Sequence, residues 1–264
     1  MTNGLQVKPR VSIQSLVHNE DFVKKANDVL GKGTQQFMSS VLSLYNSDKN
    51  LQSCDPIKLY NCCLMAAAIK LPFNQNLGHA YIIAYKGEPQ LQIGWKGFVQ
   101  LAQRSGQFKT INCTDVKEGE ILKIDRLSGE ISWDWEQDDK KRLNKETVGY
   151  VAYFELLNGF RKTLYMTVAE LERHARKYSQ TYKRGYGVWK DDFDAMSRKT
   201  VIKLILSKYA PLSVDMQKAI EYDQADSEGN YVDNKPAFEV SEAELGTSEE
   251  DRVEQKVVEE ETAN

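Results

Sequence analysis

The spacing of apolar residues changes along the chain from a helical period to an alternating one and back again. Up to residue 71, apolar side chains recur three or four positions apart, which predicts helices over residues 19–30, 35–45 and 56–71. Asp55 followed by Pro56 is a typical helix start, because an aspartate caps the first turn and proline fits its first position. We expect the second and third of these helices to contribute to the core.

Alternating apolar and polar residues in the middle of the chain predict strands. Two strands joined across residues 86–89 come first, and an amphipathic helix follows directly from Gly94. Further strands are predicted over residues 110–116, 122–125 and 131–135.

The clearest hairpin is predicted over residues 148–167. Asn158 and Gly159 stand at its turn, which we expect to need positive φ at both residues. Thr167 and Glu170 have the spacing of a capping box, so another helix should begin there. The order of helices, a mainly antiparallel sheet and helices again predicts an α+β fold, with helices packed on the sheet.

Charge is distributed unevenly along the chain, whose formal net charge is −3. Residues 1–222 carry 32 Lys and Arg against 24 Asp and Glu, whereas residues 223–264 carry 3 against 14. The acidic end has too few large apolar residues for a core, so we expect a disordered tail. Its role could be solubility, competition with a bound polyanion, or partner binding. We therefore divide the chain into a lead-in with a helix (1–34), which should contribute inter-subunit contacts, a core (35–222) and the tail.

Several functional classes lack their sequence signatures. The chain has no apolar run of about 18 to 20 residues and no signal peptide, so we expect a cytoplasmic protein without a membrane association. The 4 cysteines and 3 histidines show no metal-ligand or disulfide spacing. There is no P-loop and no nucleophile motif, so we predict a binding protein and not an enzyme. Asp191, Asp192 and Asp194 could hold a cation for a nuclease, but acids at a helix start more often complement its dipole.

Basic residues without neighbouring acids suggest a polyanionic ligand. Between Glu88 and Asp115 the only charged residues are Lys96, Arg104 and Lys109, and long glutamine side chains line the same helix. An ordinary solvated helix is the alternative, but such helices usually alternate charge signs.

Two later segments have the same character. Residues 173–190 interleave six Lys and Arg with four aromatic side chains and contain no acid, which is typical of sequence-tolerant single-strand binding. Further on, Lys199 and Lys203 form a like-charge pair four residues apart, which is unfavourable unless an anion lies between them. We interpret the three basic segments together as the site of one bound polyanion.

Two blocks of the sequence closely resemble the RecT family of phage single-strand annealing proteins. They are "LGHAYIIAYKGEPQLQIGWKGFVQLAQRSGQFKTIN" (77–112) and "WKDDFDAMSRKTVIKLILSKYAPLSVDMQKAI" (189–220), and the resemblance covers roughly residues 35–222. It implies an ATP-independent recombinase of the bacterial host's cytoplasm that binds single-stranded DNA, anneals complementary strands, holds the duplex product, and assembles into rings or helical filaments. It also implies a partner 5′→3′ exonuclease and a fold similar to eukaryotic annealing proteins. No cofactor is expected, although Mg²⁺ could accompany the DNA, and the tail could contact a host single-strand-binding protein.

Two positions depart from the family pattern. Trp95 stands where tyrosine is usual, and Leu204 stands where some members carry a second basic residue. The predicted DNA-binding residues are Lys86, Lys96, Arg104, Gln107, Lys109, Asn112, Lys183, Arg184, Trp189, Lys190, Arg198, Lys199 and Lys203. The sequence does not separate annealing from passive coating, so a nucleic-acid packaging protein remains the alternative.

Overall fold

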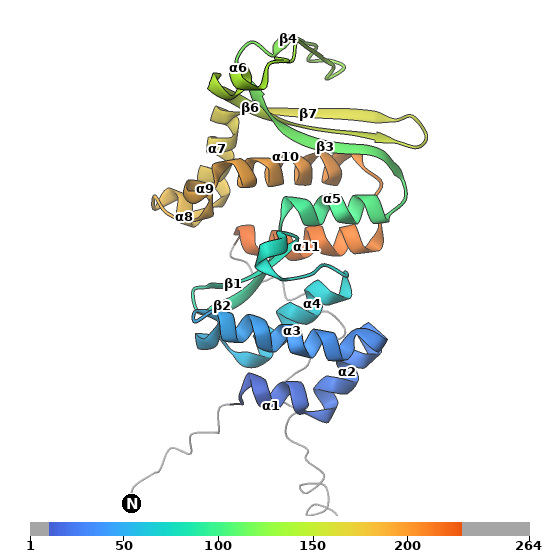
Figure 1. The fold of residues 1–264 in the computed structure, drawn as a ribbon, viewed down its shortest axis with the longest axis vertical. Helices are drawn as coiled ribbons and strands as arrows, with labels where there is room; N and C mark the ends of the chain where they lie inside the picture. Colours follow the sequence, from blue (N-terminus) through green and yellow to red (C-terminus); the bar gives the residue numbers. More distant parts are fainter. Residues whose placement is uncertain (1–10, 229–264) are drawn as a thin grey trace, which may run out of the picture. The chain divides into compact units, whose positions relative to one another are not determined.

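The computed structural model describes the backbone of residues 11–228 and the side chains of residues 11–223 (Figure 1). Most of the predicted acidic tail and the first residues of the predicted lead-in therefore lie outside the described residues. Within this range the chain forms two compact units. Unit 1 comprises residues 11–74 and 82–91, and unit 2 comprises residues 75–81 and 92–228.

Unit 1 is built on a group of helices that confirms the predicted ones and adds a further helix. Its elements are α1 (Ile13–His18), α2 (Glu20–Leu30), η1 (Gly31–Gly33), α3 (Thr34–Ser47), η2 (Leu51–Ser53) and α4 (Pro56–Ala68). Asp55 caps α4 by accepting a hydrogen bond from the Lys58 N–H, as the sequence indicates. Phe22 and Phe37 both pack edge-on against the buried ring of Tyr60, so the three longer helices share one core.

The hairpin of β1 (Ala80–Tyr85) and β2 (Glu88–Ile93) has a tight two-residue turn. Lys86 and Gly87 have φ of 52° and 84°, the pair of positive values that favours the twist of a hairpin. At the later hairpin only Gly159 has a positive φ, of 86°, so our expectation of two positive values at Asn158 and Gly159 is wrong. There the chain makes a longer loop, in which the Gly159 N–H donates to the carbonyl oxygen of Leu156.

Unit 2 is layered, with a three-stranded antiparallel sheet above helices (Figure 1). The strands β3 (Phe108–Lys117), β6 (Thr147–Leu156) and β7 (Arg161–Thr167) lie in the order β3-β6-β7. Helix α10 (Phe193–Tyr209) packs on this sheet, and α5 (Trp95–Arg104) and α11 (Val214–Glu228) form the next layer. The core between these layers is apolar, and includes Phe98, Phe154, Val201, Ile205 and Ala219.

The remaining elements of unit 2 are mostly short. They are η3 (Gln75–Leu77), β4 (Ile121–Ile124), β5 (Ile131–Trp133), α6 (Asp139–Asn144), α7 (Val168–Tyr178), α8 (Gln180–Lys183) and α9 (Val188–Asp191). The capping box of Thr167 and Glu170 is present at the start of α7. The described strands form three separate sheets and not one, but the α+β class predicted from the sequence is confirmed. No helix among residues 11–228 is long and apolar enough to span a membrane.

Candidate nucleic-acid interface

The start of α5 is fixed by close packing of backbone against backbone. Gly94 donates its N–H to the carbonyl oxygen of His79 at 2.9 Å. A Cβ atom at Gly94 would overlap the carbonyl oxygen of Gly78, and one at Gly97 would overlap that of His79. Gly94 and Gly97, which lie on either side of Trp95 and Lys96, are therefore explained by this close approach. Lys96 itself is exposed, with its ammonium 6.0 Å from the centre of the Trp95 ring.

Two predicted contacts near α5 already have acidic partners. Arg104 forms an ion pair with Asp215 of α11 at 2.7 Å, and Lys109 forms one with Glu155 of β6 at 2.8 Å. Both pairs lie at the surface, where water and salt weaken them. They can therefore exchange a carboxylate for a phosphate at small cost. Gln107, directly before β3, and Asn112, within β3, are also predicted contacts, and both are exposed.

The like-charge pair on α10 surrounds an anion that the chain itself supplies. Asp223 of α11 accepts hydrogen bonds at 2.6 Å from the ammonium groups of both Lys199 and Lys203. The carboxylate side chain is 3% exposed, and the two lysine side chains are 15% and 17% exposed. Burial alone would raise the pKa of Asp223, but the two ammonium groups lower it, so the group is ionised. This carboxylate removes the reason for placing a bound polyanion between the lysines, although their DNA contacts stay untested predictions.

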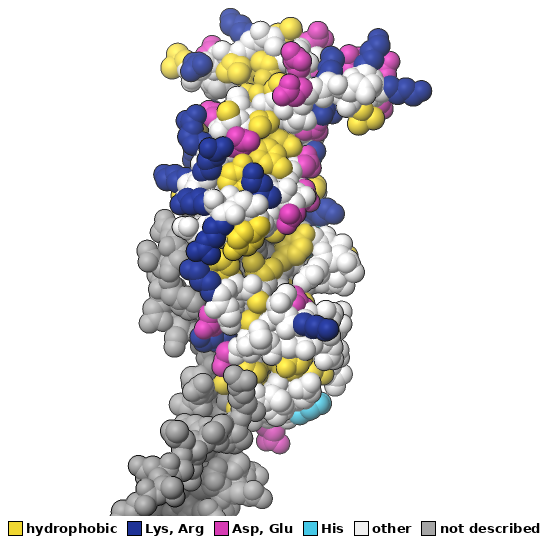
Figure 2. Space-filling view, turned by 90° about the vertical axis from the view of Figure 1, so that its left-hand side faces the viewer, with side chains coloured by type: hydrophobic (Ala, Val, Ile, Leu, Met, Phe, Trp, Pro, Cys, Tyr) yellow, Lys and Arg dark blue, Asp and Glu magenta, His cyan; other side chains and the backbone are white. Residues whose placement is uncertain are grey.

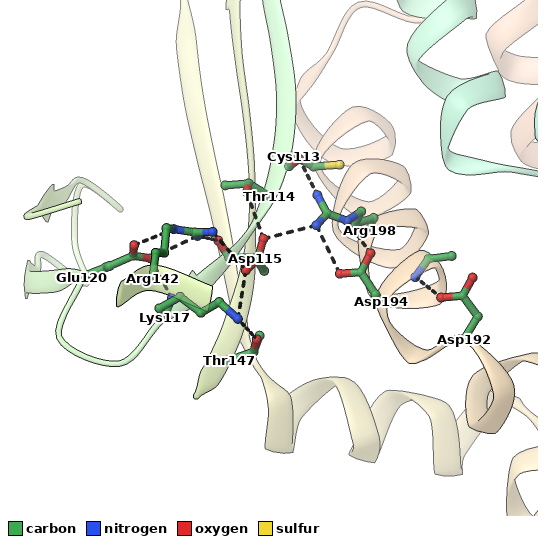
Figure 3. Close-up of polar contacts among 11 residues, drawn as sticks. Cys113, Thr114, Asp115, Lys117, Glu120, Arg142, Thr147, Asp192, Asp194 and Arg198 are labelled. Atoms are coloured by element: carbon green, nitrogen blue, oxygen red, sulfur yellow. Dashed lines mark hydrogen bonds and ion pairs between the residues drawn. The ribbon is translucent and has the colours of Figure 1, made fainter. Parts of the chain in front are cut away.

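Arg198 belongs to a half-buried polar network and points toward β3 (Figure 3). Its guanidinium donates to the carboxylate of Asp194 at 2.7 Å, to that of Asp115 at 3.2 Å and to the carbonyl oxygen of Cys113 at 3.0 Å. Burial alone would lower the pKa of Arg198, but Asp194 raises it. Arg198 thus ties α10 to β3, and hydrogen bonds within the chain use most of its donors.

Asp115 connects this network to the region of β4, β5 and α6 (Figure 3). Arg142 of α6 contacts Asp115 at 3.3 Å and the fully buried carboxylate of Glu120 at 2.8 Å. Lys117 adds a third cation 3.4 Å from Asp115. Burial opposes ionisation of Asp115, but Arg142 and Lys117 lower its pKa overall. The network therefore has a structural role in holding three parts of unit 2 together.

The segment from α7 to α9 presents cations of a different kind. We define the α7–α9 basic face as Arg173, Lys177, Lys183, Arg184 and Lys190 with the exposed rings of Tyr178 and Tyr186. Figure 2 looks onto this side of the molecule, where Lys and Arg side chains gather in a column. Among residues 11–223, no ion pair joins these five cations to a carboxylate. Their charge is therefore not neutralised within the described part of the chain.

The aromatic residues of this face divide into buried and exposed rings. Trp189 is only 6% exposed and packs against Tyr182 and Phe193, so its ring contributes to the core, and its DNA contact stays a prediction. Tyr178 and Tyr186 are 39% and 54% exposed, as a ring that stacks on a base must be. The ammonium of Lys190 lies 4.6 Å from the centre of the Tyr182 ring, which holds it beside the face.

The remaining residues considered in the sequence analysis are Lys86 and the acidic group Asp191, Asp192 and Asp194. Lys86 belongs to unit 1, so its position relative to the other predicted contacts, which all belong to unit 2, is not defined. Asp192 caps α10 by accepting from the Ala195 N–H, and Asp194 pairs with Arg198. The part of the chain that the structure describes holds no group of three or more His, Cys, Asp or Glu side chains suited to a metal ion.

Comparison with known proteins assigns the chain to a family. The model of the RecT family matches residues 35–237. An uncharacterised protein of Bacillus subtilis (strain 168), YqaK, is 43% identical over 240 residues, which cover 90% of this chain and 82% of the relative. The protein RecT of Escherichia coli (strain K12) is 28% identical over 184 residues, or 66% of this chain and 65% of that protein.

The chain belongs to the RecT family, a family of DNA-binding proteins that anneal single strands in recombination. Sequence reasoning identified this family and the basic segments, but it missed the roles of Asp115, Glu120, Arg142 and Asp223. For Asp223 a signal was present, because two lysines four residues apart call for an anion. The sequence did not indicate that this anion lies on the next helix.

Proposed function

We propose that this protein binds single-stranded DNA and anneals complementary strands without ATP, acting as an oligomer in phage-type recombination. Membership of the RecT family supports the class of activity. The observation that carries the binding site is the α7–α9 basic face, whose cations have no carboxylate partner among the described residues. Unpaired cations beside exposed rings fit a polyanion with stacking bases.

The predicted contacts can be ranked by the cost of turning each toward a phosphate. Lys96, Lys183, Arg184 and Lys190 have no ion pair to break within the described chain. Arg104 would exchange a surface pair, and such pairs contribute only about 0 to 1 kcal/mol. Removing a partner from a buried pair costs about 3 to 5 kcal/mol, which applies to Lys199 and Lys203. We therefore centre the interface on the basic face and Lys96.

Annealing follows if the protein holds the sugar–phosphate backbone and leaves base edges accessible. Cations contact phosphates whatever the sequence, so a bound strand can test an incoming one by pairing. Stacking in the product releases about 1.4 kcal/mol per step, which makes an ATP-driven step unnecessary. The protein then has only to bring the two DNA strands together and to neutralise the repulsion between their phosphates.

Assembly and partners form the second part of the proposal. A subunit that neutralises few phosphates by itself gains affinity when copies bind side by side on one strand, which favours rings or filaments. A 5′→3′ exonuclease would supply single strands, and the acidic C-terminal region is suited to contacting it or a host single-strand-binding protein. Mg²⁺ could accompany the DNA and is not assigned to any residue.

A fluorescence-quenching assay without ATP tests the proposal against the passive-coating alternative. Complementary oligonucleotides that carry a dye and a quencher should pair faster with the protein than without it, and non-complementary ones should give no quenching. Equal pairing rates with and without protein, despite demonstrated binding, would favour a coating or packaging protein.

A further inference from the structure

The carboxylate of Asp223 is the meeting point of three elements in unit 2. It accepts from Lys199 and Lys203 of α10, and it also accepts from the backbone N–H of Ile93 at 3.1 Å. Ile93 ends β2, and Gly94 and Trp95 follow as the cap and the first residue of α5. One side chain of α11 thus bonds the helix α10 and the backbone from which α5 begins.

The bond to Ile93 matters because Lys96 is only three residues further along. The position of Lys96 depends on where α5 begins, and that start has few other polar supports. Gly94 provides no side-chain cap, and no acid occupies the first turn of α5. The carbonyl oxygen of His79 and the carboxylate of Asp223 are the acceptors that hold residues 93 and 94.

The two lysines explain how an ionised carboxylate can stay in this buried place. A lone buried carboxylate would be strongly destabilising, and two ammonium groups at hydrogen-bond distance offset that penalty. Lys199 and Lys203 thus neutralise the carboxylate, and the carboxylate holds the backbone from which α5 begins. This arrangement gives both lysines a role that does not involve DNA.

We propose that Asp223 is a positioning residue that sets Lys96 for DNA contact by holding the Ile93 N–H, and that Lys199 and Lys203 neutralise Asp223 and do not bind phosphate. The proposal rests on the proposed function, because Lys96 is counted there as a phosphate contact. It concerns a residue that sequence reasoning assigned to the acidic tail.

Two matched variants separate the hydrogen bond from the charges. K199M/K203M/D223N removes all three charges but keeps an oxygen that can accept from Ile93. K199M/K203M/D223L removes the charges and the acceptor, with a side chain of similar size. Replacing a buried ion cluster by neutral groups of similar volume is often tolerated, whereas removing one partner is not. Each variant is made with Lys96 and with Lys96→Ala.

The readout is the salt dependence of single-strand affinity, measured on full-length protein with one labelled oligonucleotide. The Asn variant should keep the wild-type slope, and Lys96→Ala should lower it there by about 0.7. The Leu variant should already have lost about 0.7, and Lys96→Ala should change it no further. A slope about 1.4 lower in the Asn variant would place Lys199 and Lys203 on phosphates and overturn the proposal. Equal slopes in the Asn and Leu variants would overturn the positioning role.

Amine labelling of the unmodified protein gives an answer that does not depend on variants folding. Lys199 and Lys203 should react slowly both with and without DNA, while Lys96 and Lys183 should be protected by DNA. Fast labelling of Lys199 and Lys203 that DNA suppresses would contradict the inference. Wild-type protein that neither binds nor anneals DNA would instead contradict the proposed function, so the two failures are distinguishable.

Discussion

At the scale of single residues, the cations of unit 2 differ in what surrounds them. Lys183, Arg184 and Lys190 extend from α8, the turn after it and α9, without a carboxylate partner among the described residues. Replacing all three with Ala should weaken single-strand binding for every sequence and lower the salt slope by about 2, at about 0.7 per lost contact. Titration of a labelled oligonucleotide at several salt concentrations measures both quantities.

The matched control removes the same charge from another part of unit 2. Lys123, Arg126 and Lys140 are exposed in the region of β4, β5 and α6, and their triple Ala variant changes the net charge equally. Its salt slope should stay within about 0.7 of the wild-type value. Equal losses in the two triple variants would mean that net charge alone governs binding, which contradicts a defined site.

The buried Asp223 and the half-buried Asp115 should make the stability of unit 2 dependent on pH. The pKa values of Asp115 and Asp223 are lowered in the folded protein, because cations outweigh the effect of burial. Both groups bind protons more readily when unfolded, so their contribution is fully present above the ordinary aspartate pKa and is lost as the pH falls. The unfolding temperature should therefore drop from about pH 5 downward.

Thermal unfolding of a charge-removed variant checks the origin of this acid sensitivity. Asp115→Asn should lower the unfolding temperature at pH 7 and flatten the decline at acidic pH, because its carboxylate no longer titrates. Asp28→Asn, at an exposed position of α2, should leave the profile unchanged. Parallel profiles for the wild type and Asp115→Asn would show that this aspartate is not responsible.

The residue scale is also where sequence reasoning was least complete. The basic segments are visible because their charges are local in the sequence. Their partners are not, since Arg198 meets Asp115 across 83 residues and Lys199 meets Asp223 across 24. A lysine that binds a phosphate and one that neutralises a buried carboxylate have the same local pattern. Only the folded chain distinguishes them.

At the scale of elements, Gly94 before α5 and Gly97 within it allow the backbone of residues 78 and 79 to lie close against the start of this helix. Gly97→Ala should destabilise the protein by about 1 to 3 kcal/mol, because the added methyl overlaps a carbonyl oxygen that cannot easily move. Chemical denaturation measures the loss. Gly33→Ala is the control, since its Cβ would meet only the Leu30 Cβ at 3.9 Å and its φ is −80°. Similar losses in both would rule out the steric explanation.

Helices and strands were largely predictable because their signals are local. Caps such as Asp55 and Thr167 and the change of apolar period locate most elements within a few residues. The six-residue helices α1 and α6 were missed, because so few residues define no clear period. The division into three sheets was also missed, since strand pairing depends on contacts between distant residues.

At the scale of the whole molecule, the end of the folded region can be tested by truncation. Sequence composition places the start of the acidic tail at Asp223. In the structure α11 continues to Glu228, and the side chain of Asp223 is buried. A chain ending at residue 228 should keep the wild-type unfolding temperature. One ending at residue 222 should lose about 3 to 5 kcal/mol, because Lys199 and Lys203 remain buried without their carboxylate.

The longer truncated chain also isolates the effect of the acidic region on DNA binding. Residues 229–264 carry 11 Asp and Glu against 3 Lys and Arg, and a tethered polyanion competes with DNA for the same cations. Binding by the chain ending at 228 should be tighter than that of the full chain at low salt, with the difference shrinking as salt rises. Equal affinities at every salt concentration would leave the region as a solubility or partner-binding segment.

The β1–β2 hairpin has a consequence for how genes of this family can exchange parts. The chain leaves unit 1 after residue 74, passes through residues 75–81 of unit 2, returns for residues 82–91 and leaves again. No single crossover between two related genes can therefore transplant either unit whole. A crossover before residue 75 takes part of unit 1 from the second parent, and one after residue 91 leaves residues 75–81 with the first. Each hybrid would then combine residues from both parents within the β1–β2 hairpin or within the core of one unit. A single crossover in the gene of this recombination protein is therefore poorly suited to exchanging its two units.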